Sequence, residues 1–119
     1  MLTIPNESIP YFENAIYLPM LIKVLEKDLL VIETIEIKLK RPYIKIVDGA
    51  LNLVRADLKR TNTHLMKNNM KLYKRGTDAE FTEYMFSHFA IEEKRRYSNI
   101  RLRNRTEELI GEYFAKVII

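Results

Sequence analysis

The chain has no cysteine and no tryptophan among its 119 residues. Without cysteine it can form neither a disulfide framework nor a thiolate zinc site, and a reducing compartment is the default setting. The segment from Met1 to Phe12 lacks both the basic region and the apolar region of a secretion signal. We therefore expect a cytoplasmic protein.

Long apolar runs and turn residues are also scarce. Charges between Lys23 and Asp28 divide the most apolar stretch, Ala15 to Ile35, into pieces shorter than the roughly 18 residues that a membrane helix needs. We therefore expect no membrane association. Only 3 glycines and 4 prolines occur, and no repeat or low-complexity segment is visible. With 47% hydrophobic residues, this length suits one folded helical domain over residues 1–119.

The stretch from Ala15 to Ile35 has the strongest helical pattern. On a helical wheel its apolar side chains cover an arc roughly 200° wide, about twice what an ordinary surface helix needs. We expect a helix near residues 9–35 that lies centrally or at a dimer interface. Pro19 removes a backbone hydrogen bond and predicts a kink or break there. The apolar arc consists of Met20, Leu21, Ile22, Val24, Leu25, Leu29, Val31, Ile32 and Ile35.

Three further helices follow from local signals. Pro42 suits a first helical turn, and apolar residues then recur every three or four positions to Leu65. The residues Thr77-Asp78-Ala79-Glu80 match the capping box that begins a helix, and Ser98 or Asn99 can cap the last helix. Between them, only Lys71-Leu72-Tyr73 indicates extended chain. The predicted fold is all-α: a four-helix up-down bundle, with helices near 9–35, 42–68, 78–96 and 100–117.

Polar residues interrupt the apolar faces of the first three predicted helices. Buried carboxylates and imidazoles are costly unless they are paired. We therefore expect a hydrogen-bonded seam between helices, in which Asp28 or Asp57 meets Arg95. The residues of this predicted seam are Asp28, Asp57, Thr61, His64, His88, Glu92 and Arg95.

A metal site is the alternative interpretation of some of these residues. His88 and Glu92 stand at i, i+4 on a predicted helix, and His64 is available as a third ligand. The sequence favours the seam, because it contains only 2 histidines and no Glu-x-x-His or His-x-x-x-His pair. No combination of nucleophile, base and orienting group stands out either, so an enzyme is not favoured and no cofactor is expected.

Positive charge gathers before the last predicted helix, with no acidic residue between Lys94 and Arg105. Arginines in the first turns of a helix oppose its dipole, and a bound anion would relieve that conflict. The alternative is a solvated face with helix-spaced ion pairs, such as Arg105 with Glu108. The candidate anion or nucleic-acid site comprises Lys94, Arg96, Tyr97, Arg101, Arg103 and Arg105, with Tyr97 available to stack on a base.

Another basic group lies around the loop between the second and third predicted helices. It consists of Lys67, Lys71, Lys74 and Arg75. If the fold places this group beside the arginines of the last helix, the anion hypothesis gains. If the two groups lie at opposite ends of the molecule, the charge is diffuse and serves solubility.

Several segments carry a resemblance that spans nearly the whole chain. They are NAIYLPMLIKVLEKD, LKRPYIKIV, MKNNMK and NIRLRNRTEELI. Together they resemble the YhjD-like group of small uncharacterised proteins from Gram-positive spore-forming bacteria. The most recognisable part is AIYLPM around Pro19, which is a structural motif. The resemblance implies a bacterial cytosolic setting and implies no activity.

The function that we expect is a non-enzymatic interaction or regulatory module that forms a homodimer. The predicted dimer interface uses the first helix together with the apolar end Val117-Ile118-Ile119. The alternative is a nucleic-acid or phosphate-binding protein that uses the basic turn at 94–105. A metal-binding helical bundle is the second alternative.

Overall fold

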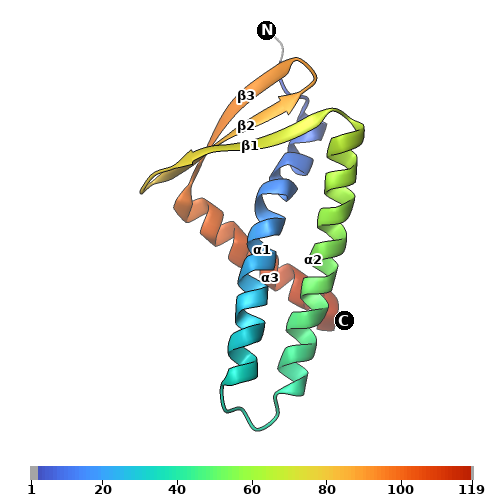
Figure 1. Ribbon diagram of the computed structural model, residues 1–119, viewed down its shortest axis with the longest axis vertical. Coiled ribbons are helices and arrows are strands. Elements are labelled where there is room, and N and C mark those ends of the chain that lie inside the picture. The colour runs from blue at the N-terminus through green and yellow to red at the C-terminus, as the bar shows by residue number, and fades with distance from the viewer. Residues whose placement is uncertain (1–2, 119) are drawn as a thin grey trace.

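The computed structural model describes residues 3–118, and it combines three helices with a three-stranded antiparallel sheet. The prediction of an all-α four-helix bundle is therefore wrong. Figure 1 shows two long helices side by side, the sheet at one end of them, and the last helix crossing them. The elements are the 3-10 turn η1 (Asn6–Ser8), α1 (Ile9–Thr34), α2 (Arg41–Lys67), β1 (Met70–Thr77), β2 (Phe81–His88), β3 (Ile91–Ser98) and α3 (Asn99–Ile118).

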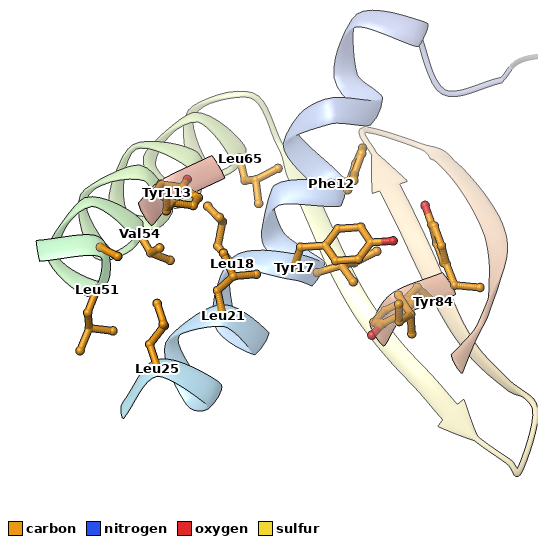
Figure 2. Packing of buried hydrophobic residues seen from close by; sticks show 14 of the residues in the cluster. Phe12, Tyr17, Leu18, Leu21, Leu25, Leu51, Val54, Leu65, Tyr84 and Tyr113 are labelled. Atoms are coloured by element: carbon orange, nitrogen blue, oxygen red, sulfur yellow. The ribbon is translucent and has the colours of Figure 1, made fainter. Parts of the chain in front are cut away.

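Helices α1 and α2 form an antiparallel hairpin that organises the core. Their facing sides bury the leucines and small residues of the two apolar patterns, and Leu21, Leu25 and Val54 are fully enclosed. Figure 2 shows side chains from both helices, from the sheet and from α3 meeting in one cluster. A shared core of this kind joins the hairpin to the segments that follow it in the sequence.

Pro19 does not break α1, which is continuous from Ile9 to Thr34. The ring of Pro19 is exposed, so the carbonyl group of Ala15 that loses its helical donor lies on the solvent side. Water can hydrogen-bond a freed carbonyl there. The helix is therefore not broken at Pro19, which stands on its outer face, and the kink stays a prediction.

The predicted helix at 78–96 is replaced by β2 and β3. Residues 77–80 form the turn between β1 and β2, in which the Asp78 carboxylate accepts hydrogen bonds of 2.8 Å from the backbone N–H groups of Glu80 and Phe81. These hydrogen bonds hold the pKa of Asp78 below its usual value. A short polar side chain can close a turn as readily as it caps a helix, so the local motif did not distinguish the two.

The strands form a meander in the order β1-β2-β3, with β2 in the centre. Tyr84 and Phe86 of β2 point toward α1, where the Phe86 ring stacks on Phe12 with centroids 4.5 Å apart. Strand β1 has an irregular register between Lys74 and Gly76, which marks a bulge. Side chains therefore alternate between an inner face, packed on the helices, and an outer face.

Helix α3 begins directly after β3 and crosses the hairpin. The Ser98 hydroxyl accepts a 3.0 Å hydrogen bond from the backbone N–H of Arg101 and caps the helix, as predicted. The Asn99 side chain donates to the Asp78 carbonyl at 2.9 Å and so ties this helix start to the β1–β2 turn. Near its end, Val117 packs against Gly49 of α2. The hairpin extends well past this crossing (Figure 1), in a molecule measuring 59 × 33 × 19 Å.

Candidate functional site

The residues of the predicted polar seam lie in separate places. Asp57 is half-buried, accepts a 2.5 Å hydrogen bond from the Tyr113 hydroxyl of α3 and pairs with Arg60. Thr61 is buried, and its hydroxyl lies 3.5 Å from the Asn14 amide of α1. These contacts join α2 to both other helices.

Two seam residues have surroundings different from those expected. Asp28 is exposed on α1, so the prediction that its carboxylate is buried between helices is wrong. Arg95 lies on β3 and pairs with Glu93 on the same strand, with Nε and Oε2 2.6 Å apart. Neither Asp28 nor Asp57 forms an ion pair with Arg95 among residues 3–118. Asp28 lies near the end of α1, before the α1–α2 loop, and the sheet lies at the other end of the hairpin (Figure 1), while Asp57 pairs with Arg60.

The structure brings together two of the three predicted metal ligands. His64 and His88 line one pocket of about 350 Å³, where the His64 ring stacks on Tyr11 at 3.5 Å between centroids. Glu92 stands on β3 opposite Ser87 and is exposed on the outer face of the sheet. Among the described residues, no group of three His, Cys, Asp or Glu side chains could hold a metal ion.

The basic turn at 94–105 is divided by the strand that it contains. Alternation on β3 directs Lys94 and Arg96 to the outer face, while Tyr97 is buried against α1. On α3, Arg103 lines a groove with Met20. The six predicted anion-binding residues therefore do not form one site.

The other residues of this turn form intramolecular contacts. The Arg105 guanidinium pairs with Glu108 at 2.9 Å, as predicted, and also with Glu112 at 3.1 Å. The guanidinium group of Arg101 stacks over the Tyr97 ring at 5.2 Å. Arg105 thus has its charge compensated on its own helix, which makes it a poor candidate for an external anion.

Buried tyrosines connect the sheet to α1. The Tyr97 hydroxyl donates a 2.8 Å hydrogen bond to the Glu13 carboxylate, and burial together with this carboxylate raises the pKa of Tyr97. The neighbouring Tyr17 is only 5% exposed, and its hydroxyl has no hydrogen-bond partner within the described part of the chain. Burial raises the pKa of Tyr17 as well. These tyrosines are kept neutral and act as packing groups.

An apolar face of α1 is one candidate interaction surface. Met20, Val24, Val31 and Ile35 follow one another at spacings of four, seven and four, so they lie on one side of the helix. The first two line a groove of about 510 Å³ against α3. The last two lie beyond α3, where Val31 is 47% exposed and Ile35 is 41% exposed.

Helix α2 continues the same face. Asp57 and Gly49 contact α3 through Tyr113 and Val117, and Leu53 stands halfway between them in the sequence, one helical turn from each. Ile46, seven residues before Leu53, extends this side of α2 past the end of α3. The hairpin therefore presents to solvent a continuation of the face that α3 covers. We name Val24, Val31, Ile35, Ile46 and Leu53 the stem face.

The outer face of the sheet was not expected from the sequence, because the strands were not. Lys71 and Tyr73 of β1 are exposed there, together with Lys94 and Arg96 of β3. The sequence did contain a signal for this face. Lys71 and Tyr73, and likewise Lys94 and Arg96, stand two residues apart, as do side chains on the same face of a strand. The apolar end of the predicted dimer interface includes Ile119, which lies outside the described residues.

Comparison with known proteins identifies relatives over nearly the whole chain. A protein-family model described as YhjD protein matches residues 3–118. The chain is 33% identical over 113 residues to a Bacillus subtilis (strain 168) protein named "Uncharacterized protein YhjD", and the match covers 95% of this chain and 94% of the relative. No solved structure matches. Within residues 3–118, none of the helices has the length and hydropathy needed to cross a membrane.

Proposed function

The chain belongs to the YhjD family, and we propose that it works as a homodimeric, non-enzymatic interaction module whose subunits join through the stem face. The observation that carries this proposal is the apolar continuation of the hairpin past α3, with Val31 and Ile35 more than two-fifths exposed. The setting that we propose is the bacterial cytoplasm.

The stem face continues the surface of the hairpin that α3 covers within one chain. This continuity supports a second copy of the chain as the partner that covers the stem face. In one chain α3 covers the upper part of this face, through contacts such as those of Tyr113 with Asp57 and Val117 with Gly49. Between α3 and the α1–α2 loop, the hairpin consists of two helices alone. Each helix there has apolar side chains on a second side, which the other helix cannot cover. Two hairpins related by a two-fold axis would complete a four-helix layer.

Asp28 gives this interface a polar element. Its carboxylate lies on the same side of α1 as Val24 and Val31, by helical spacing, and is exposed. Covering it requires a nearby cation, because an unpaired buried carboxylate is costly. A cation of the partner subunit close to Asp28 would meet this requirement. Asp28 would then set the register of the dimer.

The mass of the protein in solution tests the proposal. We expect light scattering coupled to size-exclusion chromatography to give twice the 14.2 kDa chain mass, and the Val31→Lys variant to give the chain mass. Val31 is already half exposed, so the substitution leaves the monomer fold intact, which circular dichroism would check. In a dimer, a lysine at the centre of the interface would bring two like charges together.

Leu30→Lys is the matched control. Leu30 is 63% exposed and lies about 100° around α1 from Val31, so it is outside the stem face. We expect this variant to remain dimeric. A single species at 14.2 kDa for the unmodified protein across a range of concentrations would overturn the proposal, as would equal loss of the dimer in both variants.

A further inference from the structure

We propose that the outer face of the sheet binds single-stranded nucleic acid, with Tyr73 as the base-stacking side chain and Lys71, Lys94 and Arg96 as phosphate contacts. This surface is distinct from the stem face: Figure 1 shows the sheet at the end of the hairpin opposite the α1–α2 loop. The inference does not depend on dimer formation.

The strand register places these side chains in rows across the sheet. Tyr73 of β1 stands opposite Met85 of β2, and Met85 stands opposite Lys94 of β3. In the next row, two residues along β2, Glu83 lies between Gly76 and Arg96. Neighbouring strands are about 4.8 Å apart, so Tyr73 and Lys94 flank Met85, whose side chain is only 8% exposed.

The aromatic groups of this face are accessible. The Tyr73 side chain is 48% exposed, whereas the buried Tyr84 and Tyr97 belong to the inner face. Phe81 is half-buried, and the Arg96 guanidinium lies over its ring at 4.2 Å. An exposed aromatic ring on an open antiparallel sheet suits stacking by an unpaired base, and a guanidinium plane on an aromatic ring can extend the stack.

The charge on this face favours an anionic partner. Strand β1 contributes Lys71 and Arg75 to this face and contains no acidic residue, and Arg75 at the bulge lines a pocket of about 410 Å³ together with Arg96. Within residues 3–118, none of the cations Lys71, Arg75, Lys94 and Arg96 forms an ion pair with a carboxylate.

Two carboxylates share this face, and they limit where phosphates can lie. Glu83 and Glu92 occupy outer positions on β2 and β3, and Asp78 borders the pocket beside Arg96 with its carboxylate already bonded to backbone N–H groups. A strand of nucleic acid would therefore follow β1, where acids are absent, with Lys94 and Arg96 reaching it from the far side. Unpaired cations and an exposed aromatic ring together distinguish this surface from a merely solvated one.

Fluorescence anisotropy with labelled single-stranded oligo(U) and oligo(dT) of about twelve nucleotides tests the proposal. We expect binding that weakens as the salt concentration rises. Tyr73→Ala should lose about tenfold in affinity because it removes the stacking ring, whereas Tyr73→Phe keeps the ring and should keep the affinity. The Lys94→Ala/Arg96→Ala pair should lower the dependence of log affinity on log salt by about 1.4, or about 0.7 for each lost phosphate contact. The two oligonucleotides separate a preference for RNA from one for DNA.

Lys23→Ala/Lys59→Ala is the matched control, since it removes the same charge from exposed positions on α1 and α2. This variant should bind as the unmodified protein does. Three results would overturn the proposal. The first is the absence of binding, and the second is an equal loss of affinity in Lys94→Ala/Arg96→Ala and in Lys23→Ala/Lys59→Ala. The third is an unchanged affinity in Tyr73→Ala. Displacement by polyglutamate together with an unchanged Tyr73→Ala would identify the partner as an acidic protein. If Tyr73→Ala fails to fold, Lys94→Glu/Arg96→Glu at exposed positions decides the question by abolishing the binding or leaving it intact.

Discussion

Two tyrosine hydroxyls illustrate how a single polar atom affects the core. Tyr97 donates to the Glu13 carboxylate at 2.8 Å, while the buried Tyr17 hydroxyl has no partner among the described residues. A buried hydroxyl without a hydrogen bond incurs a desolvation penalty, and a hydrogen bond to a charged group is worth about 1.5–3 kcal/mol. The same chemical change should therefore have different results at the two positions.

We expect Tyr17→Phe to leave the free energy of unfolding unchanged or to raise it by about 1 kcal/mol, and Tyr97→Phe to lower it by about 1–2 kcal/mol. Urea unfolding at neutral pH measures both values. Tyr73→Phe, at an exposed hydroxyl, is the control and should be neutral. A larger loss for Tyr17→Phe than for Tyr97→Phe would show that the Tyr17 hydroxyl has a partner after all.

At the scale of elements, the two helix glycines differ in what surrounds them. A Cβ atom at Gly111 of α3 would meet nothing within 4 Å, whereas one at Gly49 of α2 would lie 3.0 Å from Cγ1 of Val117. Replacing a glycine inside a helix by alanine stabilises the helix by roughly 0.5–1 kcal/mol. At Gly49 the approach of α3 opposes this gain.

We therefore expect Gly111→Ala to raise the free energy of unfolding by about 0.5–1 kcal/mol and Gly49→Ala to raise it less or to lower it. Combining Gly49→Ala with Val117→Ala should show favourable coupling in a double-mutant cycle of chemical unfolding, because the shortened side chain relieves the contact. Equal gains at both glycines, with no coupling to Val117, would mean that α3 does not press on α2 at this point.

At the scale of the whole molecule, alkaline pH should lower the stability of the fold through buried tyrosines in α1, the sheet and α3. Burial raises the pKa values of Tyr17, Tyr84, Tyr97 and Tyr113 above the ordinary value. Their stabilising contribution is complete below about pH 10, the pKa of tyrosine in an unfolded chain. Above that pH the unfolded chain releases protons that the folded chain retains, so stability falls.

The expected loss is up to about 1.4 kcal/mol per pH unit for each tyrosine that stays protonated. Urea unfolding between about pH 8 and about pH 11 measures this decline. In Tyr97→Phe the decline should be shallower, because one of the groups is gone, while Tyr73→Phe should follow the unmodified protein. Parallel curves for the unmodified protein and Tyr97→Phe would contradict the assignment.

The helices and the strands differed in how far the sequence predicted them. Helices α1, α2 and α3 lie within a few residues of three predicted ranges, because backbone hydrogen bonds at i, i+4 and a single apolar stripe are local properties. The segment from Met70 to Ser98 forms strands, whose hydrogen bonds come from partners elsewhere in the chain. On β3 the ion pair of Glu93 and Arg95 occupies inner positions, so the alternation of burial did not appear as an alternation of apolar residues.

The candidate surfaces were predictable to different degrees for the same reason. The wide apolar arc of Ala15 to Ile35 indicated more than one neighbour, and a helical wheel requires no tertiary information to show this. The separation of Arg95 from Lys94 and Arg96, by contrast, follows from strand geometry, which sends successive side chains to opposite faces. A helical interpretation of that segment could not find the outer face of the sheet.

The sequence by itself therefore determined the family, the three helices and the excess of apolar surface on the first of them. Only the tertiary structure decided how much of that surface stays open, because α3 covers part of it through contacts between residues far apart in the sequence, such as Tyr113 with Asp57 and Val117 with Gly49. It also decided which cations stand free, because pairing partners such as Glu93 and Glu112 are chosen by distance in the folded chain. Local patterns specify local hydrogen bonding, whereas exposure and pairing belong to the packed molecule.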